Sequence, residues 1–389
     1  MTGTAQQRAA GQAVLTGLTA ALRTADRPAF DRLVSGRDPA FTGVGDRIFA
    51  VAGLPTISLG WVLAAPQRQL PPARRSLLGS TAWVQQSTVR WQLRGDRHPA
   101  EHTLWLTFVR DGDGTRLAGT TDGPPGVGAQ PLWLVDRVHA LQQGRVTVVA
   151  AERTSATLWA RRADAATVAV ARQLHGELAP GPGAGRRWNG DLVVEVPADR
   201  ADFERVLGVA AGSYSTIAAV AWPEGPEAAT AALRIVVNPD QADRLDEDGA
   251  DVLLTHEATH VATRSVSSPA PTWLVEGFAD YVAYAAFPAT ADLAAAPVRA
   301  EVRRGGPAAL PSDSAFAPDA GDLERSYAEA WLACRFLAGT SAPERLDRFY
   351  LRVDAGEPVD RAMPAVFGLT SAQFLPRWRR YLRDTPGPG

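Results

Sequence analysis

The sequence of 389 residues contains no lysine, so all 40 of its basic side chains are arginines. The absence of lysine excludes a P-loop, a Schiff-base amine and a Ser-x-x-Lys nucleophile. Cys334 is the single cysteine, so no disulfide can form within the chain. Its apolar surroundings, AWLACRFLA, predict a buried structural thiol and not a nucleophile.

Long apolar runs are also missing, and we expect no transmembrane helix because a span needs about 20 consecutive apolar residues. The first residues, MTGTAQQRAAGQ, lack the basic and then apolar pattern of a signal peptide, which leaves localisation open. The net charge is −2, and such a balance does not favour nucleic acid as a partner. The basic run Arg377–Arg383 is expected to be a solvated helix end.

Residues 1–125 are predicted to form an α+β domain. Helical periodicity is followed by long strands rich in Trp, Val, Leu and Thr, and a turn at Asp111–Gly114 indicates a hairpin. The expected helices are Gln6–Arg23, Pro28–Val34 and Ala40–Ala52, and the expected strands are Thr56–Ala65, Thr81–Arg94, Glu101–Arg110 and Thr115–Thr121. This element order, with the segment AALRTADRPAFDRLV, resembles the cone-shaped domains of the nuclear transport factor 2-like superfamily. Such domains serve as enzymes, ligand pockets or assembly modules, so the resemblance leaves their role here open.

His98 and His102 are the only closely spaced histidines in this first part. A proline lies between them and a strand is expected, so opposite faces or a surface loop are predicted in preference to a metal site. No acid–base pair is evident among residues 1–125.

The stretch Gly123–Gln130 is rich in glycine and proline and is predicted to link the first domain to residues 131–389. The second part alternates helix and strand and becomes mostly helical after Asp246. The expected elements before that point are strands at Arg145–Ala151, Asp191–Val196, Thr216–Trp222 and Leu233–Val237, a helix at Ser155–Glu177 and a loop at Pro180–Gly185.

The segment LLTHEATHVATR contains two histidines, His256 and His260, four residues apart, with Glu257 after the first. On a helix, residues four apart lie on one face, so both imidazoles can reach one tetrahedral zinc ion. Glu257 can then take a proton from a zinc-activated water and pass it to a leaving amine.

A third ligand is expected from the following helix. The glycine and histidine that metzincins require are replaced by Thr263 and Val266, which excludes that class. After the loop SVSSPAP, the segment WLVEGFADYVAY carries Glu276 and Asp280 on one helix face. Glu276 can bind the metal, and Asp280 can accept the free N–H of a ligating histidine. The loop lets the two helices pack antiparallel around the metal.

HEATH followed by WLVEGFADY resembles the gluzincin metallopeptidases, the thermolysin-like clan, and in particular small bacterial families with a P-x-W-L-x-E-G-x-A-x-Y element. The resemblance covers residues 131–389 and is most specific in 252–336. It implies zinc held by His256, His260 and Glu276, a general base at Glu257 and a supporting acid at Asp280. Members of these families are often exported or membrane-anchored in actinobacteria.

Tyr327, in SYAEAWLACRFL, matches a tyrosine that stabilises the oxyanion in these families; a core tyrosine beside Trp331 is the other interpretation. The chain departs from the family pattern in two places. Only 15 residues separate His260 from Glu276, fewer than in thermolysin. The strand before the motif helix reads LRIVVNP and lacks the exopeptidase Gly-x-Met-Glu-Asn element, although a strand there fits a substrate-binding sheet edge.

We therefore expect a zinc peptidase that acts on peptide or protein substrates. A second interpretation is an inactive zinc-binding scaffold that binds a partner through residues 1–125. Glu257 favours catalysis, because a structural site needs no base and usually closes with a fourth protein ligand. A third is a non-peptide hydrolase using the same zinc site. The sequence decides neither endo- or exopeptidase action nor the oligomeric state.

Overall fold

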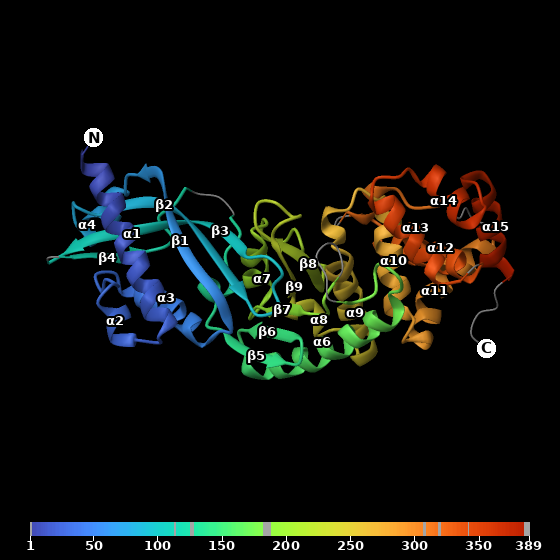
Figure 1. Ribbon diagram of the computed structural model, residues 1–389, viewed down its shortest axis with the longest axis horizontal. Coiled ribbons are helices and arrows are strands. Elements are labelled where there is room, and N and C mark those ends of the chain that lie inside the picture. The colour runs from blue at the N-terminus through green and yellow to red at the C-terminus, as the bar shows by residue number, and fades with distance from the viewer. Residues whose placement is uncertain are drawn as a thin grey trace.

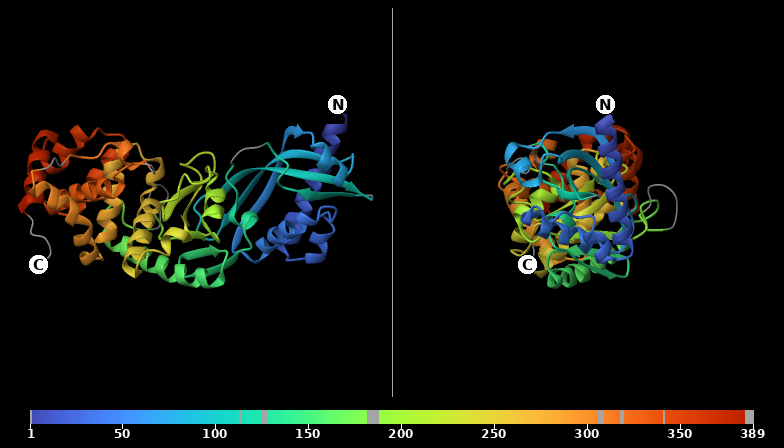
Figure 2. Two further views of the ribbon diagram at one scale, coloured as in Figure 1. Left: turned by 180° about the vertical axis from the view of Figure 1, so that it is seen from behind. Right: turned by 90° about the vertical axis from the view of Figure 1, so that its left-hand side faces the viewer.

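The computed structural model describes residues 2–112, 114–124, 128–181, 188–305, 309–317, 320–340 and 342–384. The molecule is elongated, and the helices α1 (Thr2–Arg23) and α15 (Ser371–Asp384) lie at opposite ends (Figure 1). Two sheets and then a helical region follow one another between these ends, as the view from behind also shows (Figure 2). The α+β class is confirmed. Within the described residues no helix is long and apolar enough to cross a membrane.

The first sheet is antiparallel with the strand order β1-β2-β3-β4. Its strands are β1 (Thr56–Arg68), β2 (Trp83–Leu93), β3 (Ala100–Asp111) and β4 (Gly114–Gly119). The helices around it are α1, α2 (Arg27–Asp31), α3 (Pro39–Ala50), the 3-10 turn Val51–Gly53 and α4 (Pro72–Leu78). Apolar residues of α1 and α3 pack on the sheet's large aromatic side chains, including Trp61, Trp91 and Phe108.

The second sheet is mixed, with the order β5-β6-β7-β9-β8. Its strands are β5 (His139–Gln143), β6 (Val146–Ala150), β7 (Leu192–Val196), β8 (Ala219–Glu224) and β9 (Ala232–Val237). The strands β6, β7 and β9 run parallel, and α6 (Arg153–Gln173) makes the crossover from β6 to β7. The short helices α5 (Leu132–Val135), α7 (Arg200–Leu207) and α8 (Pro239–Ala242) complete this region.

Both faces of the second sheet are covered, and successive residues of its strands alternate between two cores. Val194 and Ile235 face the helices α6 and α9 (Glu247–Thr263), in the core shared with the helical region. Val193 and Val236 face the other way and join the core of the first sheet. The two halves of the chain therefore share the apolar core on this face of the second sheet.

The remaining elements are helical and carry the C-terminal part of the chain. They are the 3-10 turn Ser265–Ser267, α10 (Thr272–Tyr284), α11 (Pro288–Arg303), the 3-10 turn Asp313–Phe316, α12 (Leu323–Gly339), α13 (Glu344–Asp354), α14 (Val359–Phe367) and α15. Helices α10 and α12 pack closely at Gly277, where an added Cβ would lie 2.4 Å from the carbonyl oxygen of Ala330.

Three sequence-based predictions about this fold need correction. The strand β5 and the helices α4, α5, α7 and α8 were not predicted, because each is short and depends on tertiary packing. His102 is not in a surface loop: it lies on β3 and is 3% exposed, whereas His98 is half-buried in the turn before β3. The predicted linker, hairpin turn and loop each fall partly on residues outside the described ranges.

The third correction concerns the strand LRIVV, which is β9. We expected it at a sheet edge, but it lies inside the sheet, paired with β7 on one side and with β8 on the other. The reason is a hairpin: β8 comes before β9 in sequence and folds back antiparallel along its outer side. The edge strand next to the motif helix is therefore β8.

Candidate metal centre

Helix α9 carries the HExxH motif and is buried from Val252 to Thr263 on nearly every side. Its N-terminus is capped by Asp246, whose carboxylate accepts the backbone N–H of Gly249 at 2.7 Å. Helix α9 packs against β8 and β9 on one side and against α6 and α10 on others. Such close packing holds its side chains in fixed rotamers. The imidazoles of His256 and His260 consequently project from one rigid face.

Helix α9 is followed by Arg264, which adopts the left-handed conformation with φ 54°. A non-glycine residue rarely takes this conformation, so the surroundings must stabilise it. The Arg264 guanidinium donates to the carbonyl oxygens of Ala228, Ala229 and Ala231 in the β8–β9 connection. These bonds fix the turn that places Ser265 next to the motif helix.

Helix α10 supplies the third side chain. The chain reverses between α9 and α10, and Glu276 faces the two histidines as the sequence predicted. Gly277 explains how α10 is seated, since the missing side chain lets α12 approach its backbone. One element thus positions Glu276 and brings α12 to the site.

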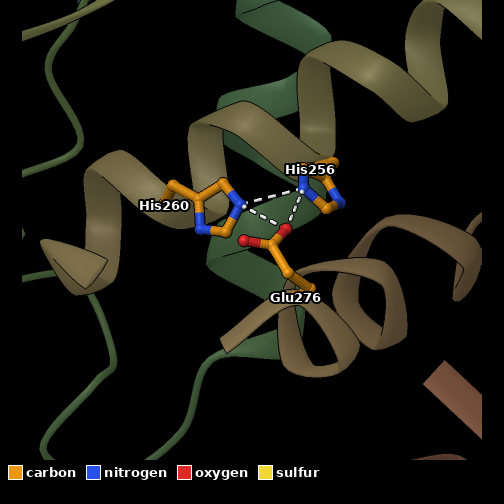
Figure 3. Close-up of side chains that lie close together, drawn as sticks. All are labelled: His256, His260 and Glu276. Carbon is orange, nitrogen blue, oxygen red and sulfur yellow. Dashed lines mark hydrogen bonds and ion pairs between the residues drawn. The ribbon is translucent and has the colours of Figure 1, made fainter. Parts of the chain in front are cut away.

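Three potential ligand atoms converge at this point (Figure 3). The Oε2 atom of Glu276 lies 3.2 Å from Nε2 of His256 and 3.3 Å from Nε2 of His260, and the two Nε2 atoms are 2.9 Å apart. A tetrahedral zinc ion with donors about 2.0–2.2 Å away separates those donors by roughly 3.4 Å. Within the described residues, no other group of three His, Cys, Asp or Glu side chains is arranged to hold a metal.

The partners of the two rings support this arrangement. The Nδ1 atom of His256 lies 2.7 Å from Oδ1 of Asp280, and an ionised carboxylate can only accept. Nδ1 therefore carries a proton, and Nε2 is the nitrogen that faces Glu276 and His260 and would bind a metal. Two nitrogens and an oxygen at this spacing repel one another unless a cation or a proton lies between them, so the donor set fits a divalent metal.

Electrostatics agree with this geometry. Burial alone would lower the pKa of His256, but the carboxylates of Asp280, Glu276 and Glu257 outweigh it and raise that pKa well above its ordinary value. Burial would likewise raise the pKa of Glu276, but the two histidines lower it far below the usual range. The pocket therefore stabilises a positive charge next to an ionised carboxylate.

Glu257 lies beside the ligands but takes no part in the triangle. Its Oε2 atom accepts the backbone N–H of Ala221 in β8 at 2.7 Å, and its side chain is buried. Burial raises the pKa of Glu257 above its ordinary value, although both histidines act in the other direction. A carboxylate whose pKa is moved toward neutrality is suited to accept and return a proton.

Tyr327 comes from α12 and reaches the same site. Its ring centroid lies 5.9 Å from that of His256. Burial, together with the carboxylates around it, raises the pKa of Tyr327 well above its ordinary value, so it stays protonated as a donor. Phe316 packs edge-on against the tyrosine ring, with 5.3 Å between centroids.

All six residues predicted for the site, His256, Glu257, His260, Glu276, Asp280 and Tyr327, lie together in the structure. Sequence reasoning missed two contributors. The hydroxyl of Ser265 lies 2.6 Å from Nδ1 of His260, so it is placed to orient the second histidine as Asp280 orients the first. The backbone of Ala221 holds Glu257. A serine directly after the motif helix was visible in the sequence, but a backbone contact leaves no sequence signal.

Comparison with known proteins found no relative: no family model, no curated protein and no solved structure matches the chain. The interpretation of the site therefore depends on its own side chains and their geometry.

Proposed function

We propose that the protein is a zinc-dependent peptidase. The observation that carries the proposal is the convergence of three ligand atoms, from His256, His260 and Glu276, beside a buried carboxylate, Glu257, that is not needed as a ligand. A purely structural zinc site usually closes with a fourth protein ligand, whereas a catalytic one keeps a position open and places a base next to it.

In this proposal His256, His260 and Glu276 hold the ion, and Asp280 and Ser265 keep the two imidazoles in the ligating orientation. Zinc, when bound, supplies the Lewis acidity that makes water a nucleophile near neutral pH and polarises a carbonyl group.

Glu257 accepts one proton from the attacking water as the new C–O bond forms. It then delivers that proton to the amide nitrogen as the C–N bond breaks, so the carboxylate is regenerated at the end of the cycle. The Tyr327 hydroxyl donates to the oxygen that becomes negative in the transition state.

The substrate is proposed to be an extended peptide that pairs with the edge strand β8. Ala221 points its N–H toward Glu257, so Ala219, Ala221 and Pro223 face the free edge in the alternation of a strand. Pro223 has no N–H, and its carbonyl oxygen already accepts the N–H of Gly225 at 3.0 Å. Because the Ala221 N–H already donates to Glu257, a bound peptide finds backbone partners on β8 at Ala219 and at the carbonyl oxygen of Ala221.

The alternative is an inactive zinc-binding scaffold. It predicts the same metal content but gives no reason for a buried glutamate with a raised pKa and a tyrosine hydroxyl at the same point. These two groups favour the peptidase.

The test combines metal content with hydrolysis of a mixed peptide library by the full chain. We expect close to one zinc ion per wild-type chain, loss of zinc in His260→Ala, and cleavage that falls at least about 100-fold in Glu257→Gln while its zinc content stays unchanged. Zinc-loaded wild-type protein that cleaves no peptide would favour the scaffold. Protein that stays free of zinc after incubation with the ion would overturn the proposal.

A further inference from the structure

The face of the second sheet that meets the first half of the chain is unusual because it carries ionisable side chains. Glu195 on β7, Arg234 on β9 and Glu224 on β8 all point to this face, and their side chains are completely buried. Burying a charge is costly unless it is paired and hydrogen-bonded. Within the sheet, Arg234 donates to Glu195 at 2.7 Å and lies 3.9 Å from Glu224.

The first half of the chain supplies the missing partners. Asp96, in the turn between β2 and β3, accepts two hydrogen bonds from Arg234, at 2.6 and 3.1 Å, and Trp91 stacks on the guanidinium at 4.0 Å. His102 on β3 places Nε2 at 2.6 Å from Oε2 of Glu224, with side chains 2% and 0% exposed. Burial would raise the pKa of Glu224, but His102 and Arg234 keep it below its ordinary value.

The His102–Glu224 contact lies at the end of an edge strand that also contacts Glu257. Glu224 is the last residue of β8, which is an edge strand paired only with β9. Three residues earlier, Ala221 donates its N–H to Glu257. An edge strand has one ladder of hydrogen bonds, so its position depends more on side-chain contacts than that of an inner strand.

We propose that His102 is a positioning residue: by holding Glu224 it fixes the edge strand β8, and through Ala221 it fixes Glu257 beside the ligand triangle. The first half of the chain is thus part of the site's framework and not an appended module. This inference depends on the proposed function only for its effect on hydrolysis, and the effect on β8 can be measured without metal or substrate.

The decisive experiment is amide hydrogen exchange of the metal-free full chain, read in peptides that cover β8. In His102→Ala we expect β8 amides to exchange at least about tenfold faster than in the wild type. His102→Gln keeps a side-chain donor toward Glu224 and should recover part of the protection. The control is Arg74→Gln, which removes the ion pairs of Arg74 with Asp38 and Asp122 in the same half of the chain, away from β8.

Two further readouts separate positioning from general destabilisation. Zinc affinity should stay within about threefold of wild type, because His102 touches no ligand, whereas the hydrolysis rate should fall at least about tenfold. Should His102→Ala fail to fold, Glu224→Gln keeps the shape and an acceptor but removes the charge, and faster exchange of the same β8 amides is expected, by less than about tenfold. Protection of β8 equal to that in Arg74→Gln would overturn the inference. If β8 loses protection in His102→Ala but the zinc-loaded wild-type protein cleaves no peptide, the inference stands and the peptidase is rejected.

Discussion

Replacing Asp280 with asparagine tests the ligand arrangement directly. Asp280 is 7% exposed, and its carboxylate accepts the Nδ1 proton of His256 at 2.7 Å. Asparagine keeps the volume but turns a charge-assisted hydrogen bond into a neutral one, and it no longer fixes which ring nitrogen carries the proton. The loss of such a partner typically weakens metal binding about 10- to 100-fold, or roughly 1.4–2.7 kcal/mol.

The assay is competition for zinc between the protein and a chromophoric chelator near neutral pH. Asp243→Asn is the matched control, because Asp243 is exposed at the end of α8 and the chemical change is identical. We expect the control to bind like wild type. Zinc affinity of Asp280→Asn within about twofold of wild type would refute the assignment of Asp280, and with it the inferred orientation of His256.

Three other changes follow from the structure. Gly277→Ala places a Cβ 2.4 Å from the Ala330 carbonyl oxygen, so α10 must move away from α12. Chemical denaturation should show that the free energy of unfolding falls by about 1–3 kcal/mol. An unchanged free energy of unfolding would contradict the close packing. Tyr327→Phe should lower the hydrolysis rate about 10- to 1,000-fold at nearly unchanged zinc affinity, and an unchanged rate would return Tyr327 to a structural role. Burial raises the pKa of Asp347 to about 6 from 3.8. The native protein then holds a proton that the unfolded chain has released, so the unfolding free energy should fall by up to about 3 kcal/mol as pH rises from about 4 to 6. Asp347→Asn should remove this slope in thermal denaturation curves; a slope that persists would show that other groups cause it.

The structure changes how the two halves of the chain are understood. The sequence suggests two domains joined by a glycine- and proline-rich linker, but the second sheet is packed between α6 and α9 on one face and the first half on the other. Arg234 and Glu224 have ionic partners, Asp96 and His102, in the first half of the chain. An isolated fragment that begins near residue 131 would expose this charged face, so experiments on the site should use the full chain.

The sequence alone identified the candidate ligands, because the relations between them are local. Helical periodicity places His256 and His260 on one face, and the second helix offers one carboxylate at the position for a ligand and another one turn later. These relations hold within single helices, so they can be read without knowing how the helices pack. The α+β class follows in the same way from the change of period after residue 55.

The tertiary structure decided what depends on pairing between distant segments. Which strand occupies the sheet edge follows from the β8–β9 hairpin, and the sequence pattern of β9 does not reveal it. The partner of Glu257 is a backbone N–H of Ala221, which any residue other than proline could supply. His102 lies 122 positions from Glu224 along the chain, and a buried pair at such separation forms only when two sheets meet. Periodicity describes one element at a time, whereas these contacts arise from the packing of several.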